Sequence, residues 1–127
     1  MKNNFKPYIV AVYGTLRKGS GNHRLLEDCK FVGEAKTNDK FTMYSHGGFP
    51  SIAKGGPKDT NIKVELYEVS NQRTSDSLDM LEGYPGWYDK KKINIDDKEV
   101  YIYTMQESIK SNRPVIESGD WIEYVKY

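Results

Sequence analysis

The chain has 127 residues and a formal net charge of +1, from 19 lysines and arginines against 18 aspartates and glutamates. This balance lacks the basic excess typical of nucleic-acid-binding proteins, and no apolar run approaches the roughly 20 residues that a membrane helix needs. We therefore expect a single domain over residues 1–127, with no nucleic acid and no membrane among its partners.

The cysteine and histidine content bears on compartment and metal binding. Cys29 is the only cysteine, so no internal disulfide can form, and residues 1–7 lack the apolar segment of a signal peptide. His23 and His46 are isolated from each other, and Cys29 has no CxxC partner. We expect a cytoplasmic protein without a metal site, as a monomer or a weak homodimer.

The first predicted element is a buried strand over residues 8–13, an apolar and β-branched run that stops at Gly14. Residues 14–22 contain two further glycines, and Asn22 is placed to cap a short helix over residues 23–29. A turn between a strand and a helix start leaves backbone N–H groups unpaired, and such groups bind anions.

The next elements are several short strands. A turn is indicated at Asn38–Asp39 and a hairpin turn at Asp96–Asp97. Pro50 lies in a short extended piece that we assign to an edge or a bulge, because proline cannot donate to a strand ladder. The predicted strands span residues 31–37, 41–45, 62–69, 87–96 and 99–105.

One longer helix is predicted, from a cap at Ser70 or Asn71 to about Leu81, and it is ended by Gly83 and Pro85. An irregular loop over residues 106–118 and a short strand or helical turn over residues 121–127 complete the chain. The hairpin-length links between neighbouring strands favour the α+β class, with a mostly antiparallel, barrel-like sheet of about six or seven strands and two short helices outside it.

Three motifs resemble one known family. The segment Tyr13–His23, hereafter the signature loop, reads Tyr-Gly-Thr-Leu-Arg-x-Gly-x-x-Asn-His and is similar to that of the γ-glutamylcyclotransferase-like superfamily, closest to its γ-glutamylamine cyclotransferase (AIG2-like) branch. Leu78–Pro85 followed by Tyr88 matches a second motif, and Ser118–Trp121 matches a third more loosely. The motifs occur in the family's order, and the resemblance implies a small closed β-barrel.

The resemblance also assigns roles to residues. It implies that Glu82 is the catalytic acid/base, and that the backbone of Tyr13–Leu16 holds the γ-glutamyl moiety with its α-carboxylate. We expect the N–H groups of Gly14, Thr15 and Leu16 to be the donors, with Tyr13 at the start of this cradle. Tyr88 matches a recurring tyrosine, which either hydrogen-bonds the substrate or forms part of the barrel wall.

The position of Glu82 has its own physical consequence. A carboxylate in the last helical turn faces the negative end of the helix dipole, and Tyr84, Trp87 and Tyr88 follow closely enough to exclude water. Both effects raise the pKa of a carboxyl, as a general acid/base at neutral pH requires. On position alone, a solvated glutamate at a helix end is the more common case, and it is the motif that favours the catalytic role.

The implied reaction is an intramolecular aminolysis of a γ-glutamyl amine or γ-glutamyl amino acid, giving 5-oxoproline and a free amine. It needs no cofactor, and the loop sequence favours γ-glutamyl amines, such as γ-glutamyl-ε-lysine, as substrates. The alternative is a non-catalytic protein of the same fold that binds a small anion through residues 14–22. Arg17 either adds charge to this loop or is solvated on an exposed turn.

Overall fold

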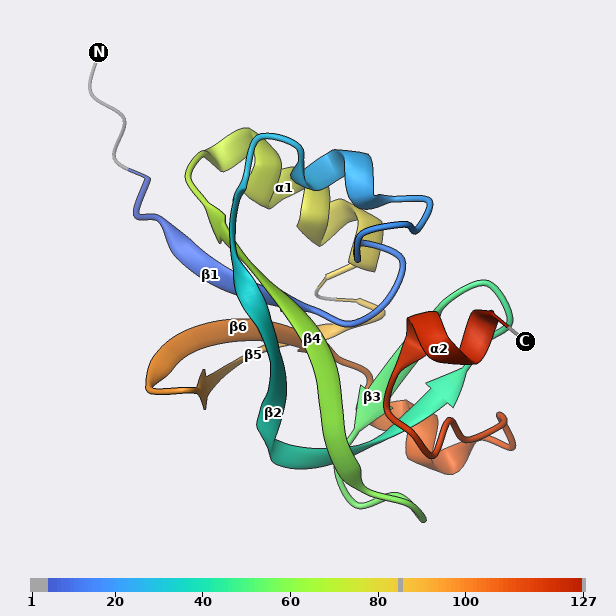
Figure 1. Ribbon diagram of the computed structural model, residues 1–127. Coiled ribbons are helices and arrows are strands. Elements are labelled where there is room, and N and C mark those ends of the chain that lie inside the picture. Colours follow the sequence, from blue (N-terminus) through green and yellow to red (C-terminus); the bar gives the residue numbers. More distant parts are fainter. Residues whose placement is uncertain (1–4, 85, 127) are drawn as a thin grey trace.

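The computed structural model describes residues 5–84 and 86–126, and its described elements form a six-stranded sheet with two α-helices and two short 3₁₀ helices (Figure 1). The α+β class is thereby confirmed. In chain order the elements are β1 (Tyr8–Val12), η1 (His23–Leu26), β2 (Lys30–Ser45), β3 (Pro50–Ala53), β4 (Thr60–Val69), α1 (Gln72–Glu82), β5 (Asp89–Ile95), β6 (Lys98–Thr104), η2 (Gln106–Lys110) and α2 (Trp121–Val125).

The sheet has the strand order β3-β2-β4-β1-β6-β5, and its neighbours are antiparallel except for the parallel pair β1 and β6. It is not closed into a barrel, so that expectation is not confirmed. A backbone hydrogen bond of 2.9 Å from Met105 to Ile52 links the end of β6 to β3, but within the described residues no strand pairing joins β3 to β5. The two edges have features that discourage pairing, because β3 has four residues and β5 carries three consecutive lysines, Lys90–Lys92.

β2 is one long strand, although two strands separated by a turn at Asn38–Asp39 were expected. Its register with β4 shifts between Lys36 and Lys40, so the extra residues form an irregularity within the strand. Asn61 Nδ2 donates to the carbonyl oxygens of Thr37 and Asn38, at 2.7 and 3.2 Å. These side-chain hydrogen bonds satisfy the irregular backbone, and the strand bends toward β3 instead of reversing (Figure 1).

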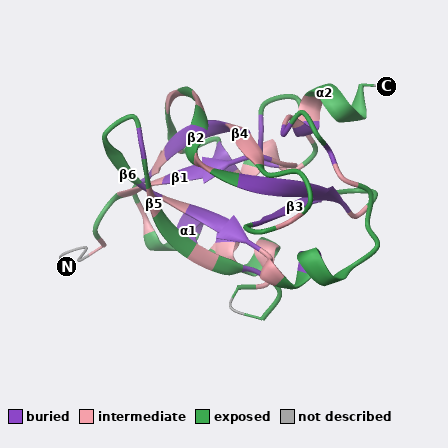
Figure 2. Ribbon diagram, turned by 90° about the horizontal axis from the view of Figure 1, so that it is seen from below, coloured by how far each residue is buried: buried purple, intermediate pink, exposed green. Residues whose placement is uncertain are grey.

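Two apolar clusters pack on opposite faces of β1, because successive side chains of a strand point to opposite sides. Val10 and Val12 belong to the cluster that includes Leu78 of α1, whereas Ala11 and Tyr13 belong to the cluster that includes Trp121 of α2. Figure 2 shows the buried strands at the centre and the exposed outer surfaces of the helices. The signature loop therefore begins from a strand that is fixed on both faces.

The ends of α1 agree with the sequence. The side chain of Asn71 accepts a hydrogen bond of 2.8 Å from Thr74 N, and Gly83 follows the helix with a φ of 66°. This left-handed conformation is readily adopted by glycine and makes Glu82 the last residue of α1. Pro85, the second predicted stop signal, lies outside the described residues.

Other local predictions need correction. The helix expected over residues 23–29 is only the 3₁₀ helix η1, and Asn22 does not cap it, because its side-chain nitrogen donates to Thr15 Oγ1 instead. The segment 106–118 is not wholly irregular, since η2 occupies its first five residues. The hairpin turn is confirmed at Asp96 and Asp97, both of which have positive φ.

Candidate active site

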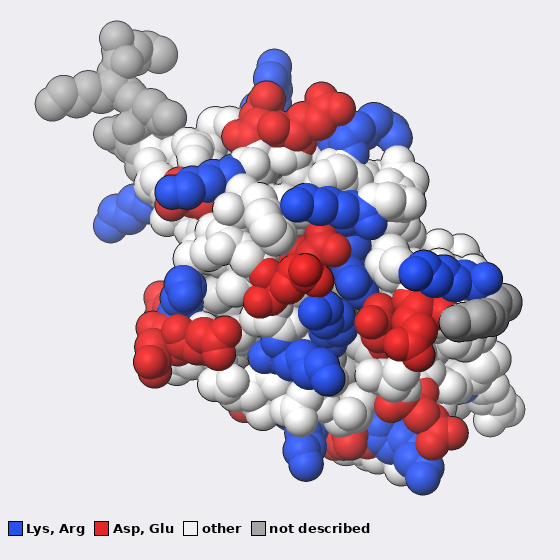
Figure 3. Space-filling view, viewed as in Figure 1, with Lys and Arg blue, Asp and Glu red and all other residues white. Residues whose placement is uncertain are grey.

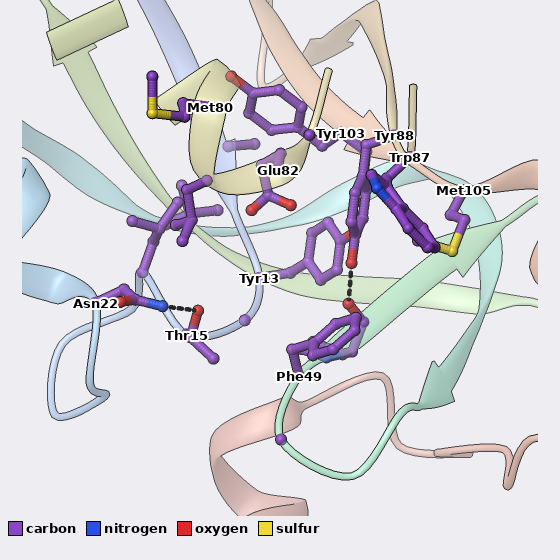
Figure 4. Close-up of a pocket in the computed structure, with 18 residues that line it drawn as sticks. Tyr13, Thr15, Asn22, Phe49, Met80, Glu82, Trp87, Tyr88, Tyr103 and Met105 are labelled. Carbon is purple, nitrogen blue, oxygen red and sulfur yellow. Dashed lines mark hydrogen bonds between the residues drawn. The ribbon is translucent and has the colours of Figure 1, made fainter. Parts of the chain in front are cut away.

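A pocket of about 520 Å³ opens where β1 ends (Figure 4). Its walls come from the signature loop, the end of α1, the turn before β3 and the end of β6. The catalytic and substrate-binding residues that the resemblance implies all line this one pocket: Tyr13, Gly14, Thr15, Leu16, Glu82 and Tyr88.

Glu82 projects its carboxylate toward the middle of the pocket (Figure 4). Among the described residues no hydrogen bond or ion pair reaches this carboxylate. Burial raises the pKa of Glu82 from 4.5 to about 7, because removal from water disfavours the ionised form. At neutral pH the group therefore exists in both protonation states, as a group that accepts and then returns a proton must.

The aromatic neighbours of Glu82 are only partly those expected. Tyr84 does not line the pocket, and Trp87 lines it but leaves 77% of its surface exposed. The buried aromatic lining consists of Tyr13, Tyr88 and Tyr103. Tyr103 lies on β6, more than twenty positions from Glu82 in the sequence, and no local signal points to it.

The hydroxyl groups of Tyr13 and Tyr88 are already engaged. Tyr13 donates to the carbonyl oxygen of Tyr103 and Tyr88 to that of Pro50, both at 2.8 Å. Burial raises the pKa of both tyrosines well above their usual value, so both remain neutral at physiological pH. Each ring is thus part of the wall, while each hydroxyl oxygen can still accept a hydrogen bond.

The first part of the signature loop presents free backbone donors. In the part of the chain that the structure describes, the N–H groups of Gly14, Thr15 and Leu16 donate no hydrogen bond, whereas those of Arg17 and Asn22 donate to the loop's own carbonyl groups. Three consecutive unpaired N–H groups can bind a carboxylate. They are on residues that line the same pocket as Glu82.

Close packing fixes this part of the loop. A Cβ atom at Gly14 would lie 2.8 Å from Cγ and Cδ of Pro50, so no larger residue fits without displacement. Asn22 Nδ2 donates to Thr15 Oγ1 at 2.9 Å, and His23 Nδ1 lies 2.9 Å from the carbonyl oxygen of Leu16. The donors are therefore held in place before any ligand arrives.

Arg17 has neither of the roles expected for it. It is buried, and its Nε donates to Glu65 Oε2 at 3.0 Å while its Nη1 donates to Asp120 Oδ1 at 2.9 Å. Lys18 N and Tyr67 Oη donate to the other oxygen of Glu65, at 2.9 and 2.8 Å. Arg17 therefore ties the loop to β4 and to the segment before α2.

The third motif supports the loop from outside the pocket. Asp120 accepts from Arg17 and also from Glu123 N, which caps α2, while Trp121 is buried in the core. None of Ser118–Trp121 lines the pocket. The motif thus makes capping and packing contacts that support the loop.

The surface charge and the described helices limit what else the fold presents. Positive and negative side chains are intermingled on the face seen in Figure 3. Several charged side chains form ion pairs, such as Lys63 with Glu34 at 3.1 Å. Among residues 5–84 and 86–126, no three His, Cys, Asp or Glu side chains cluster in a way that could hold a metal ion. None of the described helices has the length and apolarity to cross a membrane.

Comparison with known proteins agrees with this geometry. Residues 10–123 match the family described as gamma-glutamyl cyclotransferase, AIG2-like. A Methanocaldococcus jannaschii protein, provisionally named a gamma-glutamylcyclotransferase, is 37% identical over 121 residues, which cover 91% of this chain and 96% of the relative.

Solved structures show the same fold. An uncharacterised Pyrococcus horikoshii protein superposes with a TM-score of 0.77 at 28% identity, covering 94% of this chain and 93% of that protein. A mouse AIG2-like protein superposes with a TM-score of 0.74 at 21% identity, covering 89% and 88% of the two chains. The matched region includes both the signature loop and Glu82.

Proposed function

Because this chain belongs to the AIG2-like gamma-glutamyl cyclotransferase family, we propose that it converts a γ-glutamyl amide into 5-oxoproline and a free amine, with Glu82 as the general acid/base. One observation carries the proposal. A partly buried carboxylate with a pKa of about 7 and no polar partner in the described chain shares a pocket with three unpaired backbone N–H groups.

The proposed binding mode follows from these groups. The α-carboxylate of the substrate accepts hydrogen bonds from the N–H groups of Gly14, Thr15 and Leu16, which places the neighbouring α-ammonium group near Glu82. The substrate then folds so that its α-nitrogen faces its own γ-carbonyl carbon. Holding these two atoms in reacting geometry supplies much of the rate enhancement, because the attack is intramolecular.

The proposed reaction moves two protons in turn through Glu82, from the α-nitrogen to the leaving nitrogen. The ionised carboxylate removes a proton from the α-ammonium group, and the freed lone pair attacks the γ-carbonyl carbon, forming the new N–C bond of a five-membered ring. The original amide C–N bond then breaks as Glu82 gives its proton to the leaving nitrogen. The carboxylate, ionised again, removes the second proton from the ring nitrogen and passes it to the released amine, which leaves as an ammonium ion. All atoms of the substrate appear in the two products, so no oxidant or external nucleophile is consumed.

The anion-binding alternative has less support. The arginine that would attract an anion to residues 14–22 is occupied by Glu65 and Asp120. Glu82 lines the same pocket, and in its ionised form it would repel an anion that lacks the α-ammonium group of a γ-glutamyl substrate. A reaction that uses this carboxylate explains its exposure to the pocket better than passive binding does. A cytoplasmic location stays a prediction.

The test is release of 5-oxoproline from a panel of γ-glutamyl amines, γ-glutamyl dipeptides and glutathione. We expect Glu82→Gln to lower kcat by about 10²–10⁴-fold, the usual contribution of a general acid/base. Glu99→Gln, which changes an exposed glutamate in the β5–β6 hairpin, is the matched control and should retain the parent rate.

The pH dependence of kcat/KM provides a second readout of the same residue. We expect it to fall as the pH is lowered through about 7, because protonated Glu82 cannot accept the ammonium proton. Parental rates in Glu82→Gln would contradict the mechanism.

A further inference from the structure

The mouth of the pocket is surrounded by large apolar side chains that are open to water. Met80 is 82% exposed, Trp87 77%, Phe49 43% and Leu81 40%, and all four line the pocket. Scattered exposed apolar residues are ordinary, but several of them around one concave site indicate a surface that contacts a ligand. These residues are not needed for the proton transfers described above.

Two of these side chains are held in place although they are exposed. Trp87 N donates to the carbonyl oxygen of Gly83 at 2.7 Å, and a Cβ atom at Gly83 would lie 2.6 Å from Trp87 Cδ1, so the indole packs directly on this glycine. Phe49 stacks on His46, with the ring centroids 4.9 Å apart and an interplanar angle of 3°. Aromatic surface that is fixed in advance binds a ligand with little loss of side-chain entropy.

The charge of the pocket lining also restricts which substituents can bind. Glu82 is the only charged side chain among the described residues that line it, and neither lysine nor arginine is present there. Arg17, which directly follows Leu16 in the signature loop, is turned to Glu65 and Asp120. A second carboxylate on the substrate, as in a γ-glutamyl amino acid, would find no counterion among these lining residues and would lie near the partly ionised Glu82.

We propose that the amide nitrogen of the substrate carries an apolar, uncharged substituent, such as an arylalkyl group, that packs against Trp87 and Phe49. This inference rests on the proposed function and narrows its substrate class. In this binding mode the α-carboxylate is bound at Gly14–Leu16, the reacting nitrogen lies by Glu82, and the substituent extends to the apolar mouth. Figure 4 shows Glu82, Trp87 and Phe49 around the pocket. This apolar substituent differs from that of γ-glutamyl-ε-lysine, whose distal end is zwitterionic.

The test compares three γ-glutamyl amides through kcat/KM for 5-oxoproline release. The substituent of γ-glutamyl-phenethylamide has an aromatic ring but no carboxylate of its own. That of γ-glutamyl-phenylalanine has both, and that of γ-glutamyl-methylamide has neither. We expect the phenethylamide to exceed the methylamide about tenfold, the ratio that results from burying on the order of 55 Å² of apolar surface. It should exceed the phenylalanine compound by at least a similar factor.

Variants then test which residue causes the preference for the phenethylamide. Trp87→Ala should remove most of the phenethylamide-to-methylamide ratio, and Trp87→Phe should keep most of it because an aromatic face remains. Tyr124→Ala removes an exposed aromatic residue of α2 outside this pocket and should leave the ratio unchanged. Circular dichroism confirms the fold of each variant, and the parent's own ratio does not depend on any variant folding.

The outcomes separate this inference from the proposed function. Equal kcat/KM for the three amides, or a preference for the phenylalanine compound, would overturn the inference while the ring-closing reaction stands. An unchanged ratio in folded Trp87→Ala would also overturn it. If no compound of this set or of the wider panel releases 5-oxoproline, the reaction itself is wrong and the inference falls with it.

Discussion

Glu65 and Glu82 are two shielded carboxylates near the same loop, with opposite surroundings. Glu65 accepts hydrogen bonds from the Arg17 side chain, from Lys18 N and from the Tyr67 hydroxyl. Glu82 has no polar partner within the described residues, and burial raises its pKa to about 7. The first is a structural anchor and the second is poised for proton transfer, although the side chains are identical.

Hydrogen-bond partners, more than burial, distinguish these two residues. The Arg17 side chain and hydrogen-bond donors from separate segments converge on Glu65, so this carboxylate holds the loop in place. Around Glu82 the buried lining is aliphatic and aromatic, and the hydroxyl groups of Tyr13 and Tyr88 donate to backbone carbonyl groups instead. An unpaired carboxylate of this kind costs stability and is typical of functional sites.

The largest effect is expected from breaking the ion pair between Arg17 and Glu65. Arg17→Met leaves Glu65 buried without its cation, and we expect the free energy of unfolding in urea to fall by about 3–5 kcal/mol. Because Arg17 also positions Gly14–Leu16, the folded fraction should lose activity as well.

The control for this prediction is the double variant Arg17→Met, Glu65→Leu. It removes both charges and should recover much of the stability lost in Arg17→Met, because no uncompensated charge remains buried beside the loop. If the free energy of unfolding of Arg17→Met lay within about 1 kcal/mol of the parent value, the ion pair between Arg17 and Glu65 would not be an anchor.

The next effect concerns the pH dependence of stability at Glu82. Its pKa is about 7 in the folded protein and near 4.5 when unperturbed, so the folded state holds the proton more tightly. Its contribution to the free energy of unfolding is therefore fully present below pH 4.5 and is lost as the pH rises through 7, up to about 3 kcal/mol in total.

Glu82→Gln isolates this contribution. A glutamine has no proton to release, so the variant should gain stability relative to the parent as the pH rises from about 4 to about 8. Urea unfolding at several pH values measures the difference. A constant difference across this range would mean that Glu82 is ordinary in its titration, and the contrast with Glu65 would disappear.

The smallest effect is expected from removing a tyrosine hydroxyl group, and two tyrosines can be compared. Tyr67→Phe removes a donor to the charged Glu65, and we expect a loss of about 2 kcal/mol in the free energy of unfolding. Tyr88→Phe removes a donor to the neutral carbonyl oxygen of Pro50, for which about 1 kcal/mol is expected. Thermal or urea unfolding of both variants measures the order, and a reversed order would contradict the account of Glu65 as the better stabilised carboxylate.

The sequence predicts those features that depend on neighbouring residues. The apolar run of β1, the Asn71 cap and the left-handed Gly83 are local, and together they place the signature loop after a strand and Glu82 at a helix end. The signal at Asn38–Asp39 was equally local but misleading, because hydrogen bonds from Asn61 keep that stretch within β2.

Only the tertiary structure decided the surroundings of these residues. Arg17 meets Glu65 and Asp120, which are 48 and 103 positions away, and no local pattern could show that it is buried instead of solvated. Tyr103 and Phe49 reach the pocket from β6 and from the turn before β3. Backbone conformation is set by near neighbours, whereas burial, ion pairing and the pKa of Glu82 depend on which distant segments the sheet brings together.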